Sequence, residues 1–119
     1  MVTREDIYEY VKDNYNTEPD YPFEDSPKAA VLRHRINRKW YGLIMDVSYN
    51  TVGISKDGMI DIINIKLDPE IIIQLSSQKG FRPAYHMNKT HWITIVLDGS
   101  VRDDEIFNLI DLSFDLTKK

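Results

Sequence analysis

Residues 40–48 read WYGLIMDVS and residues 60–67 read IDIINIKL, and these two stretches decide the fold class. Both are rich in β-branched and aromatic side chains, which favour strands, and Lys56-Asp57-Gly58 between them is a turn signal. Strands that follow one another directly along a chain favour antiparallel pairing. Within the first stretch, alternation predicts one shared face for Tyr41, Leu43, Met45 and Val47.

Two further strands are predicted on either side of this pair. Residues 30–33 precede it across a polar connection at 35–39, and residues 92–97 (WITIVL) are apolar enough for a central strand. The sequence therefore predicts an α+β protein with a single antiparallel sheet and helices packed on one face. The 119 residues fit one domain that spans 1–119.

Three helices are predicted from helical spacing and from residues that favour helix ends. The first covers 3–15 and begins at a capping box of Thr3 and Asp6. The second starts at Asp68-Pro69-Glu70 and runs to about Gln78, because proline suits the first turn and an acid complements the helix dipole. The third follows a cap at Ser100. Its apolar positions share one face, namely Ile106, Leu109, Ile110 and Phe114.

The composition is typical of a soluble globular protein, with 42% hydrophobic and 29% charged residues. No segment approaches the roughly 20 apolar residues that a membrane span needs. Residues 1–6 lack the basic start and apolar run of a secretory signal, which predicts a cytoplasmic location. Because the chain has no cysteine, it offers neither a disulfide framework nor a thiol nucleophile.

The formal net charge is −4, but the two signs are segregated along the chain. Acidic residues concentrate towards both ends, whereas cations and histidines gather in two middle segments. The first contains Lys28, Arg33, His34, Arg35, Arg38 and Lys39, and the second contains Lys79, Arg82, His86, Lys89 and His91. If the fold brings these segments together, an acidic protein acquires one basic face.

The segment 80–92 is the strongest candidate for a functional site, because it crowds two imidazoles, two cations and three aromatic rings ahead of a strand. The spacing of its histidines does not fit the helical zinc motif, and no acid or cysteine accompanies them, so neither a metal nor another cofactor is expected. No phosphate loop or serine elbow is present, which favours a non-enzymatic role. Acid–base catalysis would need Asp46, Asp61 or Asp98 brought close by folding.

Cations mixed with aromatic side chains favour nucleic-acid binding, since Arg and Lys pair with phosphates and aromatic rings stack on exposed bases. The plainer interpretation is structural: Trp92 and Tyr85 pack against the sheet, His86 is buried, and Arg82 pairs with an acid of the last helix. The candidate binding residues are Arg33, His34, Arg35, Arg38, Lys39, Arg82, Tyr85, His86, Asn88, Lys89, His91 and Trp92.

The chain also resembles the MmcQ/YjbR family of small bacterial proteins, which are commonly described as DNA-binding and share a CyaY-like (frataxin-like) fold. The matching elements are 21–23, 30–34, 38–41, 61–66, 68–70, 83–89, 91–92, 97–101 and 113–116. The resemblance implies loops that act like paired wings against DNA, one at 85–92 and one at 33–39. Thr90 and Arg102 depart from the family pattern, where many relatives have lysine and proline. Similarity of shape to frataxin does not imply iron chemistry.

DNA is therefore the expected partner of a monomer or weak dimer, bound with little sequence preference and with marked salt dependence. Two alternatives stay open. One is a module that binds another polypeptide through its aromatic edge and acidic helix faces. The other is a small-molecule or phosphate-ester site centred on His86, Asn88 and His91, which a deep pocket lined by all three side chains would favour.

Overall fold

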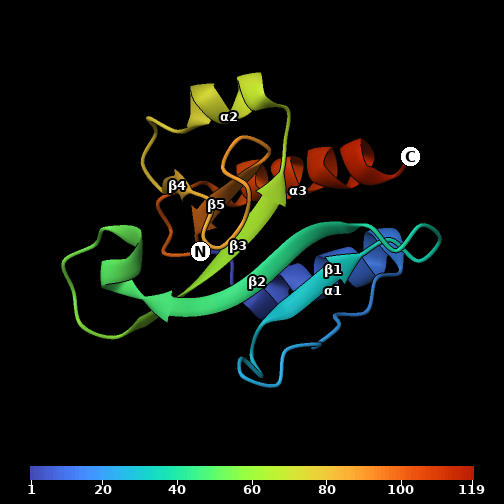
Figure 1. Cartoon of the computed structure of the whole chain (residues 1–119), viewed down its shortest axis with the longest axis horizontal. Coiled ribbons are helices and arrows are strands. Elements are labelled where there is room, and N and C mark those ends of the chain that lie inside the picture. The colour runs from blue at the N-terminus through green and yellow to red at the C-terminus, as the bar shows by residue number, and fades with distance from the viewer.

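The computed structural model describes residues 1–119 as five strands and three α-helices (Figure 1). The strands are β1 (Ala30–Arg33), β2 (Trp40–Ser48), β3 (Met59–Lys66), β4 (Phe81–Pro83) and β5 (Trp92–Val96). The helices are α1 (Arg4–Tyr15), α2 (Pro69–Leu75) and α3 (Asp103–Thr117), and the short 3-10 helix η1 (Tyr49–Val52) follows β2. Sequence analysis did not predict β4 and η1, because elements this short show no periodic pattern.

The strands form one antiparallel sheet in the order β1-β2-β3-β5-β4, which confirms the predicted α+β class. Between β1 and β2 the register shifts, so that Leu32 pairs with Gly42 and Arg33 pairs with Trp40. Tyr41 is the extra residue of this bulge, and its ring joins the core on the helix side. The shared face predicted for β2 is therefore wrong at Tyr41, because a bulge interrupts the alternation of side chains.

The helix starts are only partly as predicted. The Thr3 hydroxyl accepts from the Asp6 amide at 3.1 Å, and the Asp6 carboxylate accepts from the Thr3 amide at 3.0 Å, which confirms the capping box. Helix α2 has proline in its first turn, but it ends at Leu75 rather than near Gln78. The cap predicted at Ser100 is wrong, because residues 98–101 form a turn and α3 begins only after Arg102.

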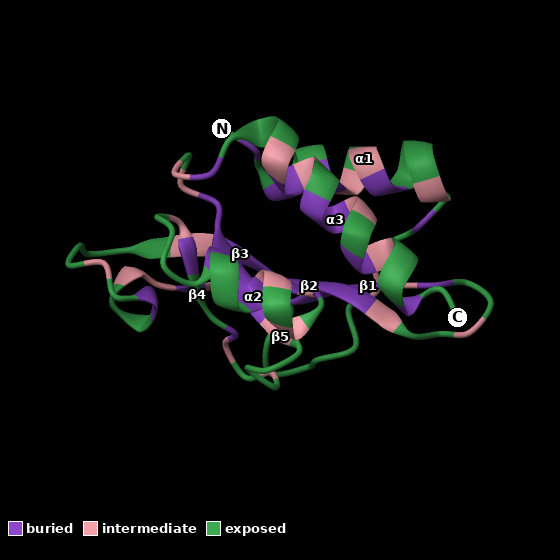
Figure 2. Cartoon of the chain, turned by 90° about the horizontal axis from the view of Figure 1, so that it is seen from above, coloured by how far each residue is buried: buried purple, intermediate pink, exposed green.

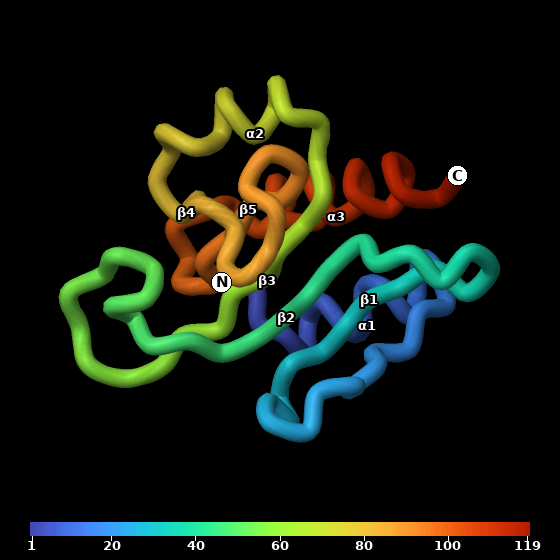
Figure 3. The backbone as a smooth tube through the Cα atoms, in the orientation of Figure 1, coloured from blue at the N-terminus to red at the C-terminus, as the bar shows by residue number.

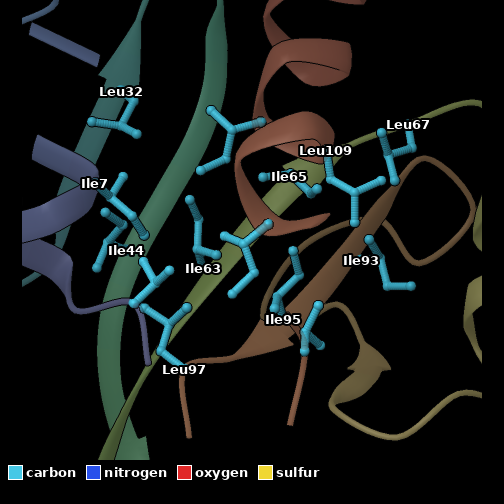
Figure 4. Close-up of a cluster of buried hydrophobic side chains, with 14 of the residues drawn as sticks. Ile7, Leu32, Ile44, Ile63, Ile65, Leu67, Ile93, Ile95, Leu97 and Leu109 are labelled. Atoms are coloured by element: carbon cyan, nitrogen blue, oxygen red, sulfur yellow. The ribbon is translucent and has the colours of Figure 1, made fainter. Parts of the chain in front are cut away.

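Helices α1 and α3 lie side by side on one face of the sheet (Figure 2). Figure 4 shows Ile7 of α1 and Leu109 of α3 within a cluster that contains the central isoleucines Ile44 and Ile63. This continuous apolar core provides the main driving force for folding. Helix α2 lies beside the β5–β4 side of the sheet (Figure 1), and its buried residues belong to the same core.

Strands β2 and β3 separate beyond the pair formed by Gly42 and Ile65. Ser113 of α3 bridges them at this point: its hydroxyl donates to the Tyr41 carbonyl at 2.6 Å and accepts from the Lys66 amide at 2.9 Å. The hydroxyl satisfies two backbone groups that the sheet no longer pairs, so α3 is fixed to the sheet by hydrogen bonds as well as by apolar packing.

The opposite face of the sheet carries no α-helix, and we call it the open face. Val47, Ile62 and Val96 form a small second core there with Val52 of η1. The connection 84–91 between β4 and β5 lies over this face, and the connection before β1 runs along its edge (Figure 3). None of the helices combines the length and the apolar character that crossing a membrane requires.

Candidate nucleic-acid interface

A buried polar pair fixes the connection 84–91 over the open face. The Thr94 hydroxyl donates to the side-chain carbonyl of Asn64, and both residues are fully buried. The Asn64 side-chain amide donates to the Tyr85 carbonyl at 2.9 Å, and the Tyr85 amide donates to the Thr94 hydroxyl at 3.0 Å. The next residue, His86, has a left-handed backbone (φ 59°) that few non-glycine residues adopt. The sheet thus holds this connection in one conformation.

Two pairs of a cation and a tryptophan lie on the open face, one on β1 and β2 and the other on β3 and β5, and β2 separates from β3 between them. Arg33 of β1 pairs in register with Trp40 of β2, and its guanidinium carbon lies 5.8 Å from the centroid of the Trp40 ring. Lys66 of β3 pairs with Trp92 of β5, on the face that Thr94 also occupies. Both tryptophans are half-buried, so part of each ring is accessible. We call these four residues the cross-sheet row.

Arg82, His86 and Lys89 line one hollow of about 440 Å³ between η1 and the connection 84–91, and we call them the loop cluster. All three side chains are exposed, and none of them forms an ion pair. The other lining residues, from 51–53 and 83–85, add no carboxylate. The loop cluster is therefore a free, positively charged surface.

Arg35, Arg38 and Lys39 lie in the turn between β1 and β2, and we call them the hairpin cluster. The two arginines form no ion pair, whereas the Lys39 ammonium donates to the backbone carbonyl of Lys119 at 2.5 Å. Arg35 lines a hollow beside the ends of α1 and α3 that contains no member of the loop cluster. Arg35 and the loop cluster thus line separate hollows. The hairpin leads directly into one tryptophan of the cross-sheet row, and the connection 84–91 leads directly into the other.

His34 is buried among residues of α3 and is not part of an accessible surface. It is 7% exposed, it packs against the Phe114 ring, and its Nε2 lies 2.8 Å from the Thr117 hydroxyl. That hydroxyl donates to the Ser113 carbonyl at 2.7 Å, so it accepts from Nε2–H of a neutral imidazole. Burial lowers the pKa of His34 and favours this neutral form. His34 therefore helps to fix the end of α3.

Of three other predicted binding residues, two have partners within the protein and one shares no hollow with His86. The Asn88 side-chain carbonyl accepts from the amides two and three residues later, at 2.9 and 3.1 Å, which closes a turn. His91 is exposed but lines no hollow with His86. Arg33 forms an ion pair with Asp20, so its charge is already partly neutralised.

The carboxylates considered as catalytic partners are engaged elsewhere. Asp61 receives two hydrogen bonds from the buried Arg4, at 2.8 and 3.0 Å. Asp46 lies 3.6 Å from the Lys28 ammonium, and Asp98 accepts from a backbone amide in the turn before α3. None of the three lines a hollow with either histidine of the segment 80–92. No three His, Asp or Glu side chains gather closely enough to hold a metal ion.

An apolar groove of about 670 Å³ lies beside the cross-sheet row on the open face. Its large apolar side chains are Phe23, Trp40, Leu43, Met45 and Met87. The rings of Phe23 and Trp40 lie edge to face with their centroids 6.0 Å apart. Glu24 and Asp25 add exposed carboxylates at one lip of the groove.

Sequence analysis missed Lys66 and the pair formed by Asn64 and Thr94. The available signal was a polar residue inside an otherwise apolar strand, since a buried amide must find a partner. The position of Lys66 two residues after Asn64 then places both on the same face. The identity of the neighbouring strand, and hence of Trp92 as the partner of Lys66, depends on a register that the sequence does not show.

A single antiparallel sheet with α-helices packed on one face defines the fold class of this protein. The family model described as YjbR matches residues 3–116, and the chain belongs to this family. It is 52% identical over 118 residues to YyaQ, an uncharacterised protein of Bacillus subtilis (strain 168), covering 99% of this chain and 100% of that protein. It is 42% identical over 53 residues to YjbR of Escherichia coli (strain K12), also uncharacterised, covering 44% of this chain and 45% of that protein.

Solved structures show the same fold. A crystal structure of a Pseudomonas syringae protein matches with a TM-score of 0.94 and 44% identity, covering 98% of this chain and 99% of that one. A Deinococcus radiodurans protein with a DUF419 domain matches with a TM-score of 0.77 and 26% identity, covering 100% of this chain and 80% of that one. The resemblance to the MmcQ/YjbR family is thereby confirmed for family and fold.

Proposed function

We propose that this protein binds DNA with little sequence preference through the open face of its sheet. The cross-sheet row is the observation that carries the proposal, because each of its two pairs places a cation beside a half-buried tryptophan on a face that no α-helix covers. Cations pair with phosphates, and accessible aromatic rings stack on bases. The loop cluster adds phosphate contacts on this face, and the hairpin cluster adds them at the end of the sheet next to Trp40.

The distribution of charge supports this proposal. Arg35, Arg38, Arg82 and Lys89 form no internal ion pair, so their charges remain available. The acidic first turns of α1 and α3 belong to helices on the other side of the sheet. Glu24 and Asp25 lie beside Trp40 on the open face, so the part of this face that a protein of net charge −4 presents as locally positive is the loop cluster, whose hollow no carboxylate lines.

Stacking on tryptophan requires bases that are not already paired, so a single strand should bind more tightly than a duplex of the same length. The test is a titration of labelled thymidine oligonucleotides with 5′ hydroxyl ends, followed by fluorescence anisotropy at several salt concentrations. About five phosphate contacts predict a slope of roughly −3 to −5 for the logarithm of affinity against the logarithm of salt. A flat salt dependence, or no binding at low salt, would contradict the proposal.

Charge-matched variants locate the surface. One variant removes two cations of the loop cluster (Arg82→Ala with Lys89→Ala), and another removes two of the hairpin cluster (Arg38→Asn with Lys39→Ala). Asparagine is chosen at position 38 because the backbone there is left-handed (φ 65°). Each should reduce the steepness of the salt slope by roughly 1 to 2. The control, Lys12→Ala with Lys79→Ala, removes the same charge elsewhere and should keep the original slope. An equal reduction of the salt slope in the control would show that DNA binding depends only on the net charge of the protein and not on these two clusters.

The apolar groove favours a second candidate function, the binding of a protein segment that is both apolar and basic. Its aromatic and methionine lining offers an apolar contact, and Glu24 and Asp25 at the lip would attract cations. Under this alternative a stoichiometric partner resists nuclease treatment, and both Phe23→Ala and Glu24→Lys release it. If neither substitution affects the complex, the groove is not its binding site.

A further inference from the structure

We infer that the hollow lined by the loop cluster binds a phosphate group carrying two negative charges, such as inorganic phosphate or the terminal phosphate of a nucleoside monophosphate. This inference goes beyond DNA binding by the open face, because it concerns a phosphate monoester and not the diester backbone. Three positively charged or imidazole side chains line the hollow, and they supply three different kinds of donor. A guanidinium offers paired donors, an ammonium offers a point charge, and an imidazole adds a further N–H.

The position of Arg82 is set by the turn that follows η1. Gly53 has a left-handed backbone (φ 76°), and a Cβ built on it would lie 3.2 Å from Nη1 of Arg82 and 3.3 Å from its Cζ. The guanidinium therefore rests against the Gly53 backbone, in space that any side chain at this position would invade. Arg82 itself comes from β4, where it pairs in register with Thr94, so its own backbone is held by the sheet.

His86 and Lys89 are supplied by the same connection, whose conformation the sheet determines. Asn64 and Thr94 hold the backbone of Tyr85, and the imidazole of His86 packs on the Tyr85 ring with the centroids 4.0 Å apart. Lys89 follows Asn88, whose side chain closes the turn. The backbone of the connection is thus fixed before a ligand binds, so binding does not require the loop itself to become ordered, which favours affinity.

The charge and the size of the hollow indicate what it holds. No carboxylate lines it, so the charges of Arg82 and Lys89 have no partner within the hollow. An anion bound there would gain charge-assisted hydrogen bonds from these side chains. The volume of about 440 Å³ falls within the range of roughly 300–1,000 Å³ that small-molecule sites occupy. There is room for a nucleoside monophosphate as well as for the ion alone.

The test is an NMR titration of the ¹⁵N-labelled chain at constant ionic strength with sodium phosphate, adenosine monophosphate, adenosine and sodium chloride. Phosphate and the monophosphate should cause saturable shifts of the amides at 51–53 and 85–89, whereas adenosine and chloride should not. Tighter binding of the monophosphate identifies a nucleotide as the ligand, and equal affinities identify the phosphate group itself. Shifts that do not saturate, or that chloride reproduces, would overturn the inference.

Matched lysine variants provide the control. Lys89→Ala should weaken phosphate binding by about tenfold or more, since it removes a charged donor. Lys79→Ala makes the same substitution at an exposed residue that lines none of the hollows described, and it should bind phosphate as the original chain does. Arg82→Gln is a second variant that shortens and neutralises the donor without removing its polar end. Unchanged affinity in both Lys89→Ala and Arg82→Gln would place phosphate elsewhere.

The two proposals fail independently. Oligonucleotides with 5′ hydroxyl ends carry no phosphate monoester, so their binding does not depend on recognition of that group. Inorganic phosphate has no base to stack, and saturable shifts at 51–53 and 85–89 assign its binding to the hollow.

Discussion

Asn64 of β3 and Thr94 of β5 lie directly opposite each other in the sheet, and together they satisfy both backbone groups of Tyr85 in the connection above them. This relationship fixes the proposed interface, because His86 and Lys89 follow Tyr85 in the same connection and Trp92 begins the strand that contains Thr94. These two side chains are buried, yet by bonding to the backbone of Tyr85 they fix the position of the exposed residues that follow it.

Removing the Thr94 hydroxyl should destabilise the protein and loosen the connection above it. Thr94→Val keeps the shape of the side chain but leaves the Asn64 carbonyl and the Tyr85 amide without partners, so we expect a loss of about 2 kcal/mol in the free energy of unfolding. Urea unfolding measures this loss, and hydrogen exchange at the Tyr85 amide should accelerate. Thr90→Val, an exposed threonine, should change stability by less than about 0.5 kcal/mol.

The ion pair between Arg4 and Asp61 should contribute strongly to stability, because Arg4 is only 7% exposed and forms no ion pair with any other carboxylate. The hydrogen bonds that Arg4 donates to the Asp61 carboxylate raise the pKa of Arg4 and keep it charged. Asp61→Asn leaves that charge buried without its partner, and the expected loss is about 3 kcal/mol in thermal or urea unfolding.

The control for this ion pair is Asp115→Asn. Asp115 lies 3.9 Å from Lys118 with both side chains exposed, so its removal should change stability by at most about 0.5 kcal/mol. Equal effects of the two substitutions would show that burial of the Arg4–Asp61 pair has no consequence for folding.

His34 should make stability fall in mild acid. Burial lowers the pKa of His34 in the folded protein, whereas the unfolded chain has the ordinary value of about 6.5. Below that pH the unfolded chain takes up a proton that the folded protein does not, so stability is complete above about pH 6.5 and declines as pH falls through the folded pKa. Urea unfolding as a function of pH measures this decline.

His34→Gln removes the titrating group and should flatten that part of the pH profile. At pH 8 the imidazole is neutral in both states, so any difference between the two proteins there reflects packing alone and should stay constant at higher pH. A decline in acid that His34→Gln leaves unchanged would assign it to other residues.

The fluorescence of each tryptophan in the cross-sheet row should show whether DNA contacts its part of the sheet, β2 for Trp40 and β5 for Trp92. Trp40→Phe leaves Trp92 as the only tryptophan, and Trp92→Phe leaves Trp40. Stacking on a base quenches indole fluorescence, so a thymidine oligonucleotide should quench both variants if the bound DNA reaches both cation–tryptophan pairs. Quenching in one variant alone would confine the contact to that end of the sheet, and quenching in neither would rule out stacking.

Patterns within short stretches of the sequence were sufficient to predict much of the fold. The capping box of Thr3 and Asp6, the strand at 30–33 and the long strand at 40–48 occur where the sequence predicts them, since short-range periodicity and capping depend on neighbouring residues alone. The prediction of a helix cap at Ser100 was wrong because the residues before α3 are equally compatible with a turn. The predicted face of Tyr41 was wrong because a bulge depends on how two strands align, which is a long-range property.

The candidate site was less accessible to prediction. The residue types that favour polyanion binding are visible in the segments 33–39 and 80–92, but nothing in them distinguishes the buried His34 from the exposed His86. Both are histidines beside cations and aromatic residues. Only packing against α3 separates them.

The amino-acid sequence by itself determined the α+β class, the antiparallel succession of strands and the presence of basic, aromatic segments, because these follow from periodicity and composition within short windows. Tertiary structure alone decided that α1 and α3 leave one face of the sheet open, that Lys66 lies beside Trp92, and that Arg35 and the loop cluster line separate hollows. Such relationships join residues far apart in the chain, and strand register and helix packing set them after the local structure has formed.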